Sequence, residues 1–166
     1  MRRVAMLVGA AAVVLLTAGL VAQTKPNFAG KWAQVVDPSA PAPAGRGGRG
    51  GGGMGGLGAA FTATQDEKTL TVTRMLQQTE IKMVYNLDGS DSKNTLSFGG
   101  QSVDQISKVK WDAAKLVITT TTNFGGNTNE STQAWSMDAT GNLVIETTTN
   151  FGGNGPTTAK TTYKKG

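Results

Sequence analysis

One segment of this chain occurs twice, and the distance between its copies restricts the fold more than any other feature. Leu-Val-Ile-Thr-Thr-Thr-Thr-Asn-Phe-Gly-Gly begins at Leu116 and returns 27 residues later at Leu143, with one threonine replaced by glutamate. A shorter copy, Leu-Ser-Phe-Gly-Gly, begins at Leu96. Because 27 residues correspond to about two strands and two turns, the repeating unit is predicted to be one β-hairpin. Repetition every two strands places the Phe-Gly-Gly turns at one end of a sheet, roughly 10 Å apart.

Alternating apolar residues predict that this sheet has many strands. Ile81, Met83, Tyr85 and Leu87 share one face of an extended segment, and more polar residues separate them. Turn signals that contain glycine recur at short spacings, which is typical of consecutive antiparallel hairpins. The sequence therefore predicts an all-β protein, an antiparallel up-and-down meander of about eight to ten strands. Such a meander is expected to close into a barrel, because closure removes its two edges; a two-sheet sandwich is the alternative.

The N-terminal residues 1–22 have the pattern of a secretory signal peptide. Two arginines precede an apolar run, and small residues precede Gln23. The alternative is a retained transmembrane anchor, since the uncharged run of 19 residues is just long enough to span a bilayer. We expect cleavage after Ala22, a secreted or periplasmic protein, and no membrane span after cleavage.

The mature chain divides into three segments by composition. Residues 23–37 are predicted to contain the first barrel strand. Residues 38–58 are rich in proline and alanine and then in glycine, so they are predicted to form a flexible loop. Residues 59–166 are predicted to complete the barrel as a β-meander, and we expect a monomer.

The composition excludes several classes of chemistry. The chain contains no cysteine and no histidine, so disulfides, thiolate nucleophiles, Ser–His pairs and histidine zinc sites are absent. The candidate carboxylates Glu130 and Glu146 lack an apolar setting that would raise a pKa for glycosidase chemistry. The two arginines of Arg46-Gly-Gly-Arg49 have no interleaved aromatic residue for nucleic-acid binding. We therefore expect no enzymatic activity, no cofactor, no metal and no nucleic-acid partner.

Both ends of the mature chain resemble a known family. Phe28, Gly30 and Trp32 form a Gly-x-Trp motif that resembles the opening strand of the calycins, the lipocalins and fatty-acid-binding proteins. The C-terminal residues 143–165 resemble the last hairpin of that group, with Tyr163 at a family tyrosine and Thr161 where the family has an arginine. The chain also resembles uncharacterised secreted bacterial β-barrel proteins. The resemblance implies a calycin-like barrel and a structural role for the Gly-x-Trp motif.

A ligand-binding barrel requires wall and rim residues, and the sequence offers aromatic and methionine candidates. The candidates are Met83, Tyr85, Phe98, Trp111, Phe124, Trp135, Phe151 and Tyr163. The phenylalanines lie beside glycine turns, where they form either an apolar portal or caps that fold back over the barrel end. The first hypothesis is non-covalent binding of a small apolar or amphipathic molecule. The second is a structural or interaction module of the cell envelope that contacts a protein or a glycan.

Two further features have structural interpretations. Trp32 is predicted to plug the closed end of the barrel, with Lys160 or Lys164 supplying a cation over its ring. Aspartates near the predicted turns offer either a calcium-binding end or ordinary turn chemistry, in which the carboxylate accepts hydrogen bonds from its own backbone. Turn chemistry is favoured, because the chain has no calcium-loop motif. These aspartates are Asp66, Asp88, Asp112 and Asp138.

Overall fold

The structure is a computed structural model that describes most of residues 24–166. The predicted signal peptide and nearly all of the predicted flexible loop lie outside the described residues, as do the side chains of Phe98 and Phe124. The described residues are 24–36, 56–76, 78–98, 100–124, 126–150 and 155–166.

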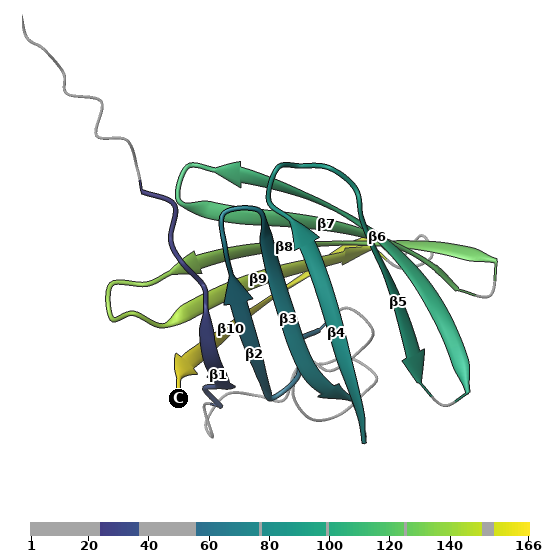
Figure 1. Cartoon of the computed structure of the whole chain (residues 1–166), viewed down its shortest axis with the longest axis horizontal. Coiled ribbons are helices and arrows are strands. Elements are labelled where there is room, and N and C mark those ends of the chain that lie inside the picture. The colour runs from purple at the N-terminus through teal and green to yellow at the C-terminus, as the bar shows by residue number, and fades with distance from the viewer. Residues whose placement is uncertain (1–23, 37–55, 77, 99, 125, 151–154) are drawn as a thin grey trace, which may run out of the picture.

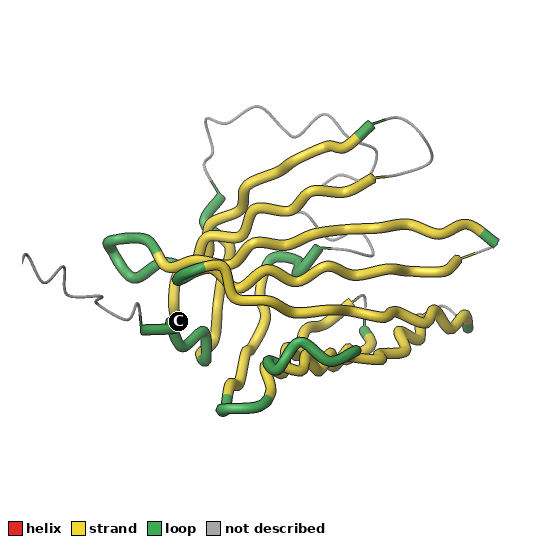
Figure 2. Tube along the Cα trace, turned by 90° about the horizontal axis from the view of Figure 1, so that it is seen from above, coloured by secondary structure: helices red, strands yellow, loops and turns green. Residues whose placement is uncertain are grey.

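Strands account for nearly all of the described chain, and Figure 2 shows strands and loops but no helix there. The first of the ten strands lies within the segment 23–37 that the sequence analysis assigned to it. The strands are β1 (Gly30–Gln34), β2 (Ala60–Gln65), β3 (Thr69–Leu76), β4 (Thr79–Asn86), β5 (Ser92–Phe98), β6 (Gln101–Asp112), β7 (Lys115–Phe124), β8 (Asn127–Met137), β9 (Leu143–Asn150) and β10 (Pro156–Lys165). Among the described residues, no helix is long and apolar enough to cross a membrane.

The strands form one antiparallel sheet that curves around a single interior (Figure 1). Their order is β4-β3-β2-β1-β10-β9-β8-β7-β6-β5, so strands that follow one another in the chain pair, except β4 and β5, and β1 pairs with β10. The predicted up-and-down meander is therefore confirmed, and it is nearly closed into a barrel. The first and last strands meet with Trp32 opposite Lys165.

The barrel closes between β4 and β5 through side chains. No backbone ladder joins these strands in the described part of the chain, although they follow one another in sequence. The side-chain amide of Asn94 accepts a hydrogen bond from the Val84 N–H at 2.8 Å and donates one to the Val84 carbonyl at 3.0 Å. The Asn86 N–H donates to the Ser92 hydroxyl at 2.7 Å. An amide side chain thus takes the place of a peptide group at this seam.

The sequence repeat corresponds to two hairpins that lie side by side, as predicted. The first copy includes most of β7 and the second includes β9. Gly125 of the first copy and residues 151–153 of the second lie outside the described residues. Leu116 and Leu143 are both fully buried, and Ile118 and Ile145 are almost fully buried. Equivalent positions in the two copies therefore face the same interior, because side chains two apart on a strand share a face.

The up-and-down topology sorts the turns between two ends. The β2–β3, β4–β5, β6–β7 and β8–β9 turns share one end, which we call the aspartate end. The other end, which we call the Phe-Gly-Gly end, holds the β5–β6, β7–β8 and β9–β10 connections. Gly99, Gly125 and residues 151–154 lie outside the described residues; the ends of the strands that flank them lie at this end.

Turn chemistry explains three of the four aspartates. The Asp66 carboxylate accepts hydrogen bonds from the N–H groups of Lys68 and Thr69, both at 2.7 Å. Asp88 accepts from the Ser90 hydroxyl at 2.7 Å and from the Ser90 N–H at 2.9 Å. These bonds favour the ionised carboxylates and lower the pKa of both aspartates.

Asp138 makes the largest set of turn hydrogen bonds. Its carboxylate accepts from the Thr140 hydroxyl at 2.7 Å, the Thr140 N–H at 2.8 Å and the Asn142 N–H at 2.9 Å. These bonds lower the pKa of Asp138 to about 2, with the Thr140 hydroxyl as the largest cause. Within the described residues, no cluster of three His, Cys, Asp or Glu side chains suits a metal ion.

Trp32 is buried, and a lysine covers its ring as predicted, but this lysine is not one of the two that were predicted. Its indole N–H donates to the Phe28 carbonyl at 2.9 Å. The cation over its ring is Lys165, whose Nζ lies 5.8 Å from the ring centroid, rather than Lys160 or Lys164. The pairing of Trp32 with Lys165 in the β1–β10 register explains this correction. A Cβ on Gly30 would lie 2.7 Å from the Lys165 Cε, so the motif glycine leaves room for this lysine.

Candidate functional site

The interior of the barrel changes character along its axis. Toward the aspartate end it is apolar and aromatic. The centroid of the Phe28 ring lies 5.7 Å from that of the Trp135 ring and 6.1 Å from that of the Trp111 ring. We call this region the apolar half; its fully buried side chains include Phe28, Leu70, Leu116, Trp135 and Leu143. Further along the same strands, the inward positions become polar. We call this second region the polar half; its buried members include Arg74, Gln105, Ser107, Thr122 and Gln133.

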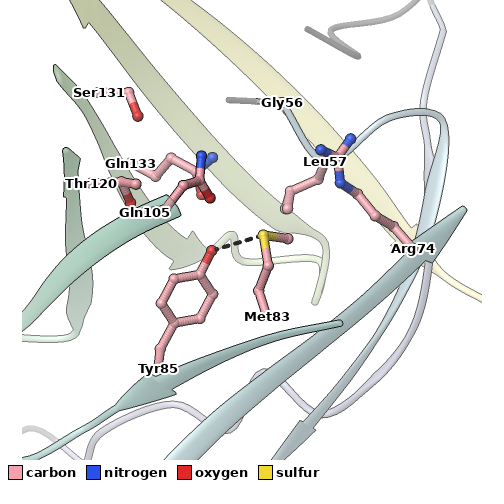
Figure 3. Close-up of a pocket in the computed structure, with 9 residues that line it drawn as sticks. All are labelled: Gly56, Leu57, Arg74, Met83, Tyr85, Gln105, Thr120, Ser131 and Gln133. Atoms are coloured by element: carbon pink, nitrogen blue, oxygen red, sulfur yellow. Dashed lines mark hydrogen bonds between the residues drawn. The ribbon is translucent and has the colours of Figure 1, made fainter. Parts of the chain in front are cut away.

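A small cavity lies in the polar half (Figure 3). The volume open to the centre of a water molecule is about 10 Å³, which is room for about one water molecule. Figure 3 shows Arg74 reaching the cavity beside Leu57, with Gln105 and Gln133 on another side. The lining residues are Gly56, Leu57, Arg74, Met83, Tyr85, Gln105, Thr120, Ser131 and Gln133.

Neighbouring side chains satisfy several of the polar groups. The Gln105 amide donates to the Thr122 hydroxyl at 3.0 Å, and the hydroxyls of Ser107 and Thr120 share a hydrogen bond of 2.8 Å. These contacts cross from β6 to β7, because inward-facing residues of paired strands stand side by side.

One hydrogen bond connects the polar half to the apolar half. The indole N–H of Trp135 donates to the Gln133 side-chain oxygen at 3.0 Å. The two residues lie two positions apart on β8 and share its inward face. The boundary between the halves therefore runs between Gln133 and Trp135 on this strand.

Arg74 differs from the other polar residues of the interior. The residue is 3% exposed, yet its Nε and Nη1 atoms have no hydrogen-bond partner. None of the described residues that line the cavity is acidic. The ion pair found among the described residues joins Lys108 and Asp91 at 3.5 Å, and both side chains are largely exposed. A buried guanidinium without a carboxylate is energetically costly, so Arg74 is the most unusual group of the interior.

Burial and the two interior tyrosines set the electrostatics around Arg74. Burial lowers the pKa of the Arg74 guanidinium, and Tyr85 and Tyr163 act in the opposite direction. Burial raises the pKa of each tyrosine to about 12, partly offset by the positive charge of Arg74. Both phenols are therefore neutral at physiological pH, and neither provides a counter-charge for the guanidinium.

The segment that precedes β2 contacts the interior. Leu57 is 4% exposed and belongs to the buried apolar cluster although it lies outside the strands. The neighbouring Gly58 carbonyl accepts a hydrogen bond from the Tyr163 hydroxyl at 3.1 Å. The Leu57 side chain therefore occupies volume that would otherwise enlarge the cavity.

The predicted wall residues occupy three different settings. Met83 and Tyr85 line the cavity, and the Tyr85 hydroxyl donates to the Met83 sulfur at 3.4 Å. Tyr163 is buried and contacts the Phe61 ring at 5.0 Å. Trp135 is buried in the apolar half. Trp111 is half-buried and packs against the same buried cluster, and neither tryptophan is among the residues that line the cavity. The Phe98 and Phe124 side chains and Phe151 lie outside the described residues.

The sequence analysis missed the polar residues that distinguish the cavity. Leu70, Val72 and Arg74 alternate on β3 with half-buried threonines. An arginine that continues an apolar alternation was therefore a visible signal, and its inward direction follows from the period of two. Gln105 and Gln133 occupy comparable inward positions on β6 and β8.

No family model matches the sequence, and no curated protein matches it.

Proposed function

We propose that this protein is a secreted, lipocalin-like barrel that binds a small apolar or amphipathic molecule non-covalently in its interior. The observation that carries this proposal is the division of the interior into an apolar half and a polar half, with the cavity on the polar side. A ligand with a hydrocarbon body and a polar group has the same division. Binding sites for small molecules typically combine apolar walls with a few polar groups that fix the orientation of the ligand.

The size of the cavity defines what binding requires. Space for about one water molecule does not accommodate a hydrocarbon body. Leu57 is the cavity-lining residue that lies outside the barrel wall and carries a large side chain. The proposal therefore requires that the Leu57 side chain leave its position when the ligand enters.

A fluorescence titration tests this proposal. The purified protein is titrated with N-phenyl-1-naphthylamine, whose emission rises in apolar surroundings, and with long-chain alcohols and retinoid-like molecules as competitors. We expect saturable one-to-one binding. Leu57→Ala should bind the probe more tightly, because truncation opens volume beside the cavity. Met75→Ala is the matched control, since it shortens an apolar side chain that is 60% exposed.

The absence of saturable binding to both the unmodified protein and Leu57→Ala would overturn the proposal. That result would favour the second candidate, a structural or interaction module of the cell envelope that contacts a protein or a glycan. The observation that favours this alternative is the small size of the cavity, which has room for about one water molecule.

A further inference from the structure

We infer that Arg74 provides a binding site for an oxyanion, such as a carboxylate, within the polar half of the barrel. The inference rests on the proposed function where the oxyanion is the polar group of an amphipathic ligand. The same chemistry is available from a free small oxyanion, and the experiment below distinguishes these two sources.

The first support is the unsatisfied state of Arg74. Its guanidinium is nearly inaccessible to solvent, and two of its nitrogen atoms have no acceptor. A charged donor in this state has lost its hydration without receiving a protein partner in return. An oxyanion provides both the hydrogen-bond acceptors and the negative charge that the guanidinium lacks.

The second support is the composition of the cavity wall. Among the described residues, the wall contains the positive charge of Arg74 and no carboxylate. The remaining polar lining groups are the neutral amides of Gln105 and Gln133, the hydroxyls of Tyr85, Thr120 and Ser131, and the backbone. The electrostatic potential at the cavity is therefore positive, and it favours an anion over a neutral or cationic group.

The third support is the protonation of the neighbouring phenol. Tyr85 lines the same cavity, and burial raises its pKa to about 12. The phenol therefore keeps its proton at neutral pH and does not form a phenolate partner for Arg74. A protonated phenol is itself a donor, so it is able to give a further hydrogen bond to an anion.

Arg74 lies outside the two segments of the chain that carry the sequence resemblance. Arg74 lies on β3, whereas the resemblance concerned the opening strand and the last hairpin. The site combines β3 and β4 on one side of the cavity with β6, β7 and β8 on the other. It is therefore a product of barrel closure rather than of a local motif.

A pair of matched probes tests the inference. 8-Anilinonaphthalene-1-sulfonate and N-phenyl-1-naphthylamine share one aromatic body and differ by a sulfonate group. The sulfonate probe should bind about tenfold more tightly or better, because a hydrogen bond to a charged group is worth about one to two powers of ten in affinity. Arg74→Met should remove this preference, and Arg74→Lys should retain part of it. Lys160→Met, which removes an exposed positive charge, should leave the preference unchanged.

A second measurement reports the site without a hydrophobic probe. Sodium acetate, compared with sodium fluoride at equal ionic strength, should raise the melting temperature of the unmodified protein through preferential binding to the folded state. Arg74→Met should not respond to acetate. In acetate-free buffer, Arg74→Met should melt at or above the temperature of the unmodified protein, because it removes an unpaired buried charge. A purely structural arginine predicts the opposite shift.

The outcomes separate the inference from the proposed function. Equal affinity for both probes, unchanged in Arg74→Met, would overturn the inference and leave the proposed function standing. Acetate stabilisation that depends on Arg74, without binding of either probe, would support a free-anion site and overturn the proposed function. If neither probe binds and acetate has no effect, both fail. If Arg74→Met does not fold, the sulfonate preference in Arg74→Lys and the acetate response of the unmodified protein decide.

Discussion

The two halves of the barrel interior are built from the same strands, but they meet different physical demands. On β8, Trp135 is fully buried among aromatic rings, whereas Ser131 and Gln133 line the polar cavity. Burial of the large apolar side chains supplies most of the favourable free energy of folding. The polar half contributes less free energy of folding, because its hydrogen bonds mainly replace hydrogen bonds made with water in the unfolded chain. The comparison indicates that the apolar half contributes most of the stability of the barrel, and the polar half is where we propose that a ligand binds.

The largest expected effect is in the apolar half. Trp135→Ala should lower the free energy of unfolding by about 3–5 kcal/mol, because it removes a fully buried ring and leaves a cavity. Ser131→Ala, four residues earlier on the same strand, should change it by about 0.5 kcal/mol or less. Urea unfolding measures both values. Similar losses for the two variants would mean that the halves do not differ in their contribution to stability.

Alkaline pH should act on the polar half. The pKa of Tyr85 is about 12 in the folded protein, above the ordinary value of 10 for an exposed tyrosine. The contribution of the protonated, buried Tyr85 phenol to folding stability is therefore fully present below pH 10 and is lost as the pH rises through 12. The shift corresponds to about 2–3 kcal/mol.

Tyr85→Phe provides the measurement that isolates this titration. Its free energy of unfolding should fall less steeply between pH 10 and 12 than that of the unmodified protein, and the difference removes the common contribution of lysines. Parallel curves for the two proteins would show that Tyr85 does not lose stability by ionising.

The seam between β4 and β5 should give the smallest of the three effects. Asn94→Ala removes two hydrogen bonds to Val84 and should cost about 1–2 kcal/mol in urea unfolding. Lys93→Ala, on the outward face of the same strand, is the control and should be close to neutral. A neutral Asn94→Ala would show that the side-chain closure of the barrel adds nothing to stability.

Much of the fold could be predicted from the chain because the relevant signals are local. The repeat predicted hairpins, and the period-two alternation predicted that Ile81, Met83 and Tyr85 share one face of β4. The aspartate turns were predictable because Asp66, Asp88 and Asp138 accept hydrogen bonds from residues two to four positions away. Secretion and signal cleavage remain predictions.

The candidate site was predictable only in part because its features depend on distant strands. Met83 and Tyr85 were expected in the wall and do line the cavity. The isolation of Arg74 was not predictable, since it depends on which residues of β4, β6, β7 and β8 face it. The cation over Trp32 was misassigned for a similar reason, because only the β1–β10 register places Lys165 there.

The sequence by itself determined that the chain forms strands, which side chains of each strand share a face, and that alternate turns gather at opposite ends. Those properties follow from chain periodicity and turn chemistry, which act between near neighbours. The pairing of distant strands fixed three further features: β4 and β5 stay unpaired, Lys165 covers Trp32, and Arg74 is buried without a counter-charge among the described residues. The physical reason is that closure of the barrel brings together residues far apart in the chain, and their mutual distances decide which charges and hydrogen bonds are satisfied.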